Sequence, residues 1–185
     1  RGDTLIDTDD HIRPDTTLEG LSKLRPACGK EGTVTAGNAS GIVDGAASLV
    51  LTSAERAKSD RPDVWASIRA PAPVGGDPSE MGIGPVPAIQ RCLKIAGLKL
   101  DDVDLVEINE AFAGQYLGCE KELGLDRERT NVNGGAIALG HPIGMSGTRL
   151  AITLAYELKR RGGGVGAAAL CGGGGQGDAM LLRVS

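Results

Sequence analysis

Aromatic residues are scarce in this sequence of 185 residues. One phenylalanine, two tyrosines and one tryptophan account for 2% of it, whereas hydrophobic residues as a whole make up 41%. A core with so few rings must be built from close-packed valine, leucine, isoleucine and alanine. The length suits one domain, which can bury roughly 70% of its unfolded surface.

Long apolar runs and a strong charge are also lacking. No run approaches the roughly 20 apolar residues of a membrane-spanning helix. The net charge of −4 gives no electrostatic reason to bind nucleic acid or an anionic membrane, so we expect neither partner. Because no secretory signal opens the chain, we expect an intracellular, cytoplasmic protein. The chain begins Arg1-Gly2-Asp3 without a methionine, so we expect residue 1 to be an artificial or proteolytic boundary.

The cysteines lack the spacing of a metal site or of a disulfide framework. Cys28, Cys92, Cys119 and Cys171 form no CxxC pair, which favours reduced thiols inside a cell. We predict no bound metal. Glycine, by contrast, is abundant, with 29 residues, more than twice the average share of about 7%. Glycine-rich turns let the backbone approach another backbone or a ligand closely.

Strands and helices are expected to alternate after a polar, turn-rich arm of residues 1–32, in which only Thr17–Leu24 has a helical pattern. Apolar runs predict strands at Ala46–Leu51, Val64–Ala70, Val103–Ile108, Val165–Leu170 and Ala179–Val184. Helical spacing, prolines and glycines predict helices at 53–59, 85–96, about 110–123 and about 145–161. This order predicts an α/β layered domain. Because only a glycine turn separates the last two strands, they should be antiparallel and the sheet mixed.

Three short segments carry polar groups at the ends of predicted strands. They are Asn109-Glu110-Ala111-Phe112-Ala113, the glycine-rich run Asn133–Pro142 that contains His141, and Cys171–Gly177 with its four consecutive glycines. In layered α/β folds, ligands bind at such loops. An amide, an imidazole and a thiol beside glycines suit acyl chemistry on a thioester.

Each of these groups also has a structural interpretation. Asn109 is a good N-cap for the helix expected at 110–123, and a thiol such as Cys171 is commonly buried and inert. A lone histidine in a loop is more often structural than catalytic, but the long motif around His141 reverses that preference. A helix beginning soon after Pro142 would lower the pKa of the imidazole if it points at the ring.

Together with the run Gly32–Gly41 (Gly-Thr-Val-Thr-Ala-Gly-Asn-Ala-Ser-Gly), these motifs closely resemble the C-terminal half of the thiolases, which make or cleave 3-ketoacyl-CoA. The resemblance implies a layered thiolase-type C-terminal domain over residues 33–185, with a mixed β-sheet and helices on both faces. Residues 1–32 would be the tail of the CoA-binding loop region. The family's N-terminal half, where the acylated cysteine lies, has no counterpart in the sequence.

The resemblance also implies a role for each polar group. His141 would activate the nucleophilic cysteine of the N-terminal half and, with a water held by Asn109, bind the thioester oxygen of the incoming acyl-CoA. Cys171 would be the acid and base that moves the proton at the substrate Cα. The Gly173 amide would help to form a second oxyanion hole around the acyl-enzyme, and such donors typically contribute about 3–4 kcal/mol each.

Coenzyme A or an acyl-CoA would be the substrate, and no cofactor would stay bound permanently. The family's CoA contacts fall on Ser40 and Ala36 for the pantetheine, on Met81, Ala111 and Phe112 for its tunnel, and on Arg13 near the adenine. The expected partners are the N-terminal thiolase half and further copies in a homo-oligomer. Without that half, we expect the chain to be inactive and either marginally stable or self-associating.

Two other functions stay open at this point. The chain could be a non-catalytic CoA-binding or scaffold module that keeps the motifs as structure. It could also be a self-sufficient hydrolase with Cys171 as nucleophile and His141 as base. The thiolase half ranks above both, because the three motifs occur together and no motif for a separate nucleophile accompanies them.

Overall fold

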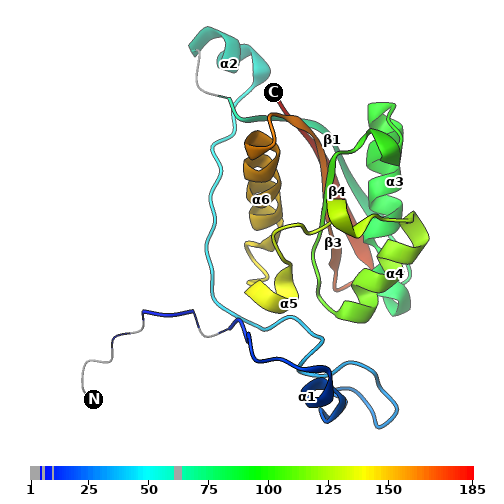
Figure 1. Cartoon of the computed structure of the whole chain (residues 1–185). Coiled ribbons are helices and arrows are strands. Elements are labelled where there is room, and N and C mark those ends of the chain that lie inside the picture. Colours follow the sequence, from blue (N-terminus) through cyan, green and yellow to red (C-terminus); the bar gives the residue numbers. More distant parts are fainter. Residues whose placement is uncertain (1–4, 6, 10, 61–63) are drawn as a thin grey trace.

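The computed structural model describes residues 5, 7–9, 11–60 and 64–185 (Figure 1). Within them, four strands form one mixed sheet in the order β1-β4-β3-β2. The strands are β1 (Ala66–Gly75), β2 (Leu105–Ile108), β3 (Gly164–Gly172) and β4 (Gln176–Val184). β2 runs parallel to β3, whereas β4 runs antiparallel to both β3 and β1. The predicted mixed sheet and its closing hairpin are therefore confirmed.

Helices cover both faces of this sheet, as predicted (Figure 1). On one face lies α3 (Pro85–Ala96), whose Ile89 is fully buried against the sheet, and α4 (Ala113–Leu123) contributes to the same core. On the other face lies α6 (Ser146–Arg160). Its buried stripe consists of Leu150, Leu154 and Leu158. Two largely aliphatic cores thus form, one on each face, as the scarcity of aromatic residues predicted.

Shorter elements lie in the N-terminal segment and in the connections between these layers. They are α1 (Leu18–Ser22), α2 (Ala54–Asp60), α5 (Ala136–Leu139) and the 3-10 helices η1 (Pro78–Ile83), η2 (Leu100–Asp102) and η3 (Arg127–Arg129). Glycines end the two long helices of the first face, since Gly97 and Gly124 are both left-handed C-caps. α1 lies in the predicted arm and buries none of its residues. No described helix combines the length and the apolar character that crossing a bilayer requires.

The strand predicted at Ala46–Leu51 is wrong. This run has no regular structure, and most of its side chains are exposed, Val50 by 99%. A strand needs a neighbour for its backbone N–H and C=O groups, and no described segment pairs with this run. An apolar pattern predicts burial, but the surface that would cover this run is not among the described residues.

The helix predicted from about residue 110 begins later, and Asn109 is not its N-cap. The helix starts at Ala113, and Phe112 occupies the capping position with extended backbone. Pairing with the N-terminal segment explains this, because the Ser40 amide donates to the Ala111 carbonyl (3.0 Å). The pairing keeps residues 111 and 112 out of the helical conformation. It also frees the Asn109 side chain from capping.

Leu150→Ala should lower the free energy of unfolding by about 3 kcal/mol, because Leu150 is fully buried and its loss leaves a cavity under α6. Leu117→Ala is the matched control on the exposed side of α4, and it should cost less than about 1 kcal/mol. Urea unfolding of both variants measures the difference. Equal losses would contradict the assignment of α6 to a core.

Candidate active site

Asn109 and His141, which lie far apart in the sequence, meet at the end of β2. The Asn109 carboxamide nitrogen lies 3.3 Å from His141 Nε2. Asn109 follows β2 directly and is fully buried. His141 is half-buried, and its backbone N–H donates to the Gly41 carbonyl (2.9 Å). The structure thus brings together two of the three side chains expected to be catalytic.

Ser146, the first residue of α6, holds the other side of the imidazole. His141 Nδ1 lies 2.6 Å from Ser146 Oγ, and that hydroxyl donates its single proton to the Pro142 carbonyl (2.9 Å). With its proton on the Pro142 carbonyl, the hydroxyl accepts from the ring, and on this basis we assign the imidazole proton to Nδ1. Nε2 then carries the lone pair and accepts from the Asn109 amide. An unprotonated nitrogen of this kind is what a general base needs.

The surroundings lower the pKa of His141 below its ordinary value. Burial disfavours the charged ring and is the larger cause, and the positive charge of Arg149 on α6 adds to it. Since the ordinary value of 6.5 already lies below neutrality, the ring is uncharged at pH 7. A neutral imidazole can take a proton from a thiol.

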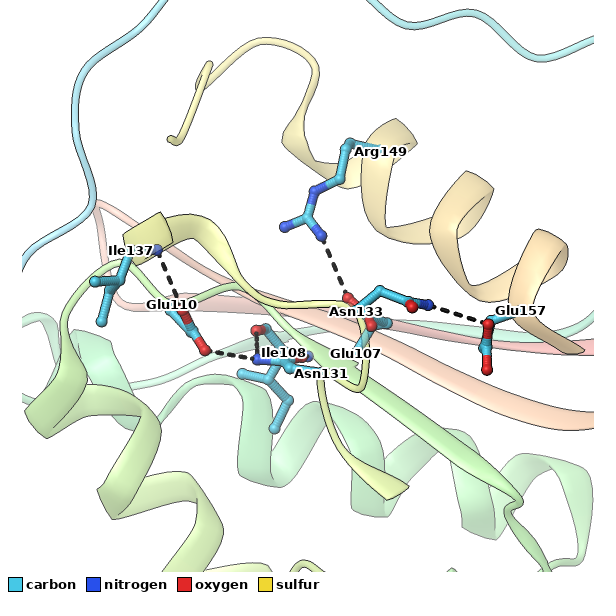
Figure 2. Close-up of polar contacts among 8 residues, drawn as sticks. All are labelled: Glu107, Ile108, Glu110, Asn131, Asn133, Ile137, Arg149 and Glu157. Atoms are coloured by element: carbon cyan, nitrogen blue, oxygen red, sulfur yellow. Dashed lines mark hydrogen bonds and ion pairs between the residues drawn. The ribbon is translucent and has the colours of Figure 1, made fainter. Parts of the chain in front are cut away.

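Arg149 is itself held by a buried carboxylate. Glu107 of β2 is 2% exposed, and its Oε2 lies 3.3 Å from Arg149 Nη1 (Figure 2). Burial raises the pKa of Glu107 to about 7, although the charge of Arg149 opposes the shift. The ion pair ties β2, which leads to Asn109, to α6, which carries Ser146. It therefore links the two elements that hold the ring.

Cys171 lies at the same edge of the sheet, near the end of β3, the strand parallel to β2. The residue is half-buried, and burial raises the pKa of its thiol. Among the hydrogen bonds of the described residues, none joins this thiol to Asn109 or His141. Gly173 lies beyond it in the exposed turn, with open space around its Cα. The third group is thus placed on the neighbouring strand, without a direct bond to the other two.

Three of the residues that the resemblance assigns to CoA lie together. Ser40 Oγ donates to the Ala111 carbonyl (3.1 Å), and the residue before Ser40 forms a bridge with Phe112. The remaining three are placed separately: Met81 in η1, which packs against α4, and Ala36 and Arg13 on exposed parts of the N-terminal segment. In the part of the chain that the structure describes, no group of three or more His, Cys, Asp or Glu side chains could hold a metal ion.

Sequence reasoning missed Ser146, Glu107 and Arg149. Glu107 gave a signal, since a charged residue stands inside a strand predicted to be buried, and a buried charge needs a partner. Ser146 and Arg149 gave none. Helical spacing showed which face of their helix is apolar, but not which strand that helix covers.

Two family models match the chain. The model described as "Thiolase, C-terminal domain" matches residues 63–184, and the one described as "Thiolase, N-terminal domain" matches residues 1–55. The chain therefore belongs to the thiolase family, as the resemblance predicted. The match over residues 1–55 corrects the expectation that the N-terminal half has no counterpart here, because that stretch corresponds to part of the N-terminal domain.

Comparisons with individual proteins also support membership of this family. The chain is 54% identical over 183 residues to the human 3-ketoacyl-CoA thiolase, mitochondrial, which covers 99% of this chain and 46% of the relative. It is 53% identical over 183 residues to the acetyl-CoA acetyltransferase of Shinella zoogloeoides, covering 99% of this chain and 47% of the relative. A crystal structure of the human mitochondrial 3-ketoacyl-CoA thiolase in complex with CoA matches with a TM-score of 0.93 at 54% identity, over 97% of this chain and 46% of that chain. The chain spans about half the length of the curated relatives that it matches.

Glu107→Gln should remove a pH-dependent loss of stability. Because the pKa of Glu107 rises from 4.5 to about 7 on folding, the folded state holds the proton more tightly. The wild-type chain therefore loses stability as the pH rises from 4.5 through 7. The variant cannot ionise, so its unfolding free energy relative to wild type should grow by about 3 kcal/mol over this range.

Urea unfolding at about pH 4.5 and about pH 7.5 measures this change for both chains. Glu122→Gln, at an exposed position of α4, serves as the control and should show no such trend. A stability difference that stays constant with pH in the Glu107 variant would contradict the burial of this carboxylate.

Proposed function

We propose that this chain is the C-terminal half of a thiolase that transfers acyl groups between CoA thioesters. The reaction would be thiolysis of 3-ketoacyl-CoA or Claisen condensation of acetyl-CoA. One observation carries the proposal: the Asn109 carboxamide nitrogen lies 3.3 Å from His141 Nε2. Membership of the thiolase family supports the same chemistry.

His141 acts as the base in this proposal. Its neutral ring, with the proton on Nδ1, takes the proton from the nucleophilic cysteine of the N-terminal half. Once Nε2 is protonated, it donates a hydrogen bond to the thioester oxygen of the incoming acyl-CoA. The lowered pKa of His141 supports the first step, because the ring is uncharged before it acts.

Asn109 completes the oxyanion hole through a water. Its Oδ1 is buried and has no hydrogen-bond partner among the described residues. An unsatisfied buried acceptor costs about 1–3 kcal/mol, so the site favours a bound water that donates to Oδ1. The second proton of that water can then point to the thioester oxygen.

Cys171 acts as the acid and base at the substrate Cα. Its raised pKa keeps the thiol protonated at neutral pH, so the thiol has a proton to deliver to a carbanion. The Gly173 amide, in the exposed turn beyond it, donates to the oxygen of the acyl-enzyme. Both assignments need a substrate between the ends of β2 and β3.

We also propose that the rest of the N-terminal thiolase domain packs against the exposed apolar segment before β1, which itself matches that domain's model, and that the chain is inactive without it. Side chains there are strongly exposed: Ile42 by 93%, Val50 by 99% and Leu51 by 72%. Burying such a surface stabilises an association by about 25 cal/mol per Å². The complete protein would assemble further into a homo-oligomer.

Acyl-CoA would lie along the junction of the N-terminal segment and α4. Ser40 and Ala36 would contact the pantetheine, and Arg13 the adenine end. Met81, Ala111 and Phe112 would line the tunnel. The hydrogen bond between Ser40 and the Ala111 carbonyl supports this grouping, because it joins the two segments.

A chimaera tests the function. This chain is joined to the N-terminal half of the Shinella zoogloeoides acetyl-CoA acetyltransferase, a relative that is 53% identical over 183 residues, and CoA-dependent cleavage of acetoacetyl-CoA is measured. The chimaera should be active and this chain alone inactive. His141→Ala and Cys171→Ala should each lower kcat by about 10²- to 10⁴-fold, because each removes a proton-transfer group.

Cys92→Ala is the control, since Cys92 is a buried thiol of α3 that has no role in the proposed reaction. It should keep its turnover per folded molecule. A folded chimaera without activity would defeat the proposal. Turnover that survives His141→Ala would favour a non-catalytic CoA-binding or scaffold module instead.

A further inference from the structure

Glu110 stands next to Asn109 but binds a different set of partners (Figure 2). Its Oε2 accepts from the Ile137 backbone N–H at 3.1 Å, and its Oε1 accepts from Asn131 Nδ2 at 3.1 Å. Ile137 is the second residue of α5, the short helix that leads to His141. A half-buried carboxylate at the end of β2 is thus bonded to the segment that carries the catalytic histidine.

Asn131 fixes the second partner of this carboxylate in place. Its side chain binds both backbone groups of Ile108: Oδ1 accepts from the N–H (2.9 Å), and Nδ2 donates to the carbonyl (2.9 Å). Its backbone N–H donates to the Val106 carbonyl (2.9 Å). Asn131 adopts a positive φ of 48°, which asparagine tolerates better than most residues. The residue therefore extends the hydrogen-bonded edge of β2 towards Glu110.

Gly135 gives the carboxylate room. This glycine is buried, and an added Cβ would overlap the carboxylate of Glu110. The Glu110 carboxylate thus accepts from the Ile137 backbone N–H and from the Asn131 side-chain amide. It also occupies the space that a side chain at position 135 would fill. The catalytic steps proposed above do not use it.

We propose that Glu110 is a positioning residue for His141. By holding the first turn of α5 against the end of β2, it sets where the chain leaves that helix, and so keeps the imidazole in contact with Asn109. The path from Ile137 to His141 is short, about one helical turn, so a displacement of α5 passes directly to the ring. Only the effect on turnover rests on the proposed function; the position of the ring does not.

The two carboxylates of this region act on different supports of the ring. Glu107 binds Arg149 of α6 and so steadies the Ser146 side of the imidazole. Glu110 binds α5 and so steadies the backbone that enters His141.

A direct test follows from the histidine content, because the chain contains only two. Isotope-labelled histidine and an NMR titration give the pKa of His141 and its Nε2 chemical shift, and the signal that disappears in His141→Gln assigns it. In Glu110→Ala and in Gly135→Ala, the pKa of His141 should rise towards its ordinary value of 6.5, since the ring leaves its buried position. The Nε2 signal should also lose the effect of the Asn109 hydrogen bond.

Matched controls are Glu122→Gln, at an exposed position of α4, and Gly114→Ala, where an added Cβ meets open space. Both should leave the His141 signals unchanged. Glu110→Gln keeps the size and one acceptor, so its shift should be smaller than that of the alanine variant. If Glu110→Ala does not fold, the Glu110→Gln variant still tests the positioning role.

In the active chimaera, the Glu110 variants should lower kcat by about tenfold with little change in KM, because the ring is misplaced rather than removed. A folded Glu110→Gln chain in which the His141 pKa and nitrogen shifts equal those of wild type would overturn the inference. That result would stand even if the chimaera proved inactive, so failure of the positioning role is distinguishable from failure of the proposed function.

Discussion

The site depends on one hydrogen-bonded chain, from the Asn109 amide through the His141 ring to the Ser146 hydroxyl. Both ends are positioned by secondary structure, because Asn109 directly follows β2 and Ser146 opens α6. The ion pair between Glu107 of β2 and Arg149 of α6 joins the same two elements. A shift of β2 against α6 by one residue would remove a partner from the imidazole. The packing of β2 against α6 therefore positions the partners of both ring nitrogens.

Local patterns in the sequence predicted most of the layered fold. The stripe of Leu150, Leu154 and Leu158 predicted the buried face of α6, and the glycines at 97 and 124 predicted where α3 and α4 end. These signals are local, since each depends on spacing within one element. The glycine turn between the last two strands predicted the closing hairpin for the same reason.

The errors came from contacts between distant segments. Ala46–Leu51 is apolar enough for a buried strand, but no described segment pairs with it. Asn109 suited a helix cap by its local context, yet pairing of Ser40 with Ala111 delays the helix. The same limit applies to the site. Motifs identified Asn109 and His141, whereas their supports, Ser146 and the carboxylates of β2, depend on which helix covers which strand.

The most direct measurement of the central claim is the nitrogen chemical shifts of the two His141 ring atoms at pH 7 in this chain. We expect one protonated nitrogen, Nδ1, bonded to Ser146, and an unprotonated Nε2 that accepts from Asn109. A ring that is protonated on Nε2 alone, or on both nitrogens, would contradict it. Such a ring would have no free lone pair on Nε2, so that nitrogen could neither take a proton from a thiol nor accept from the Asn109 amide.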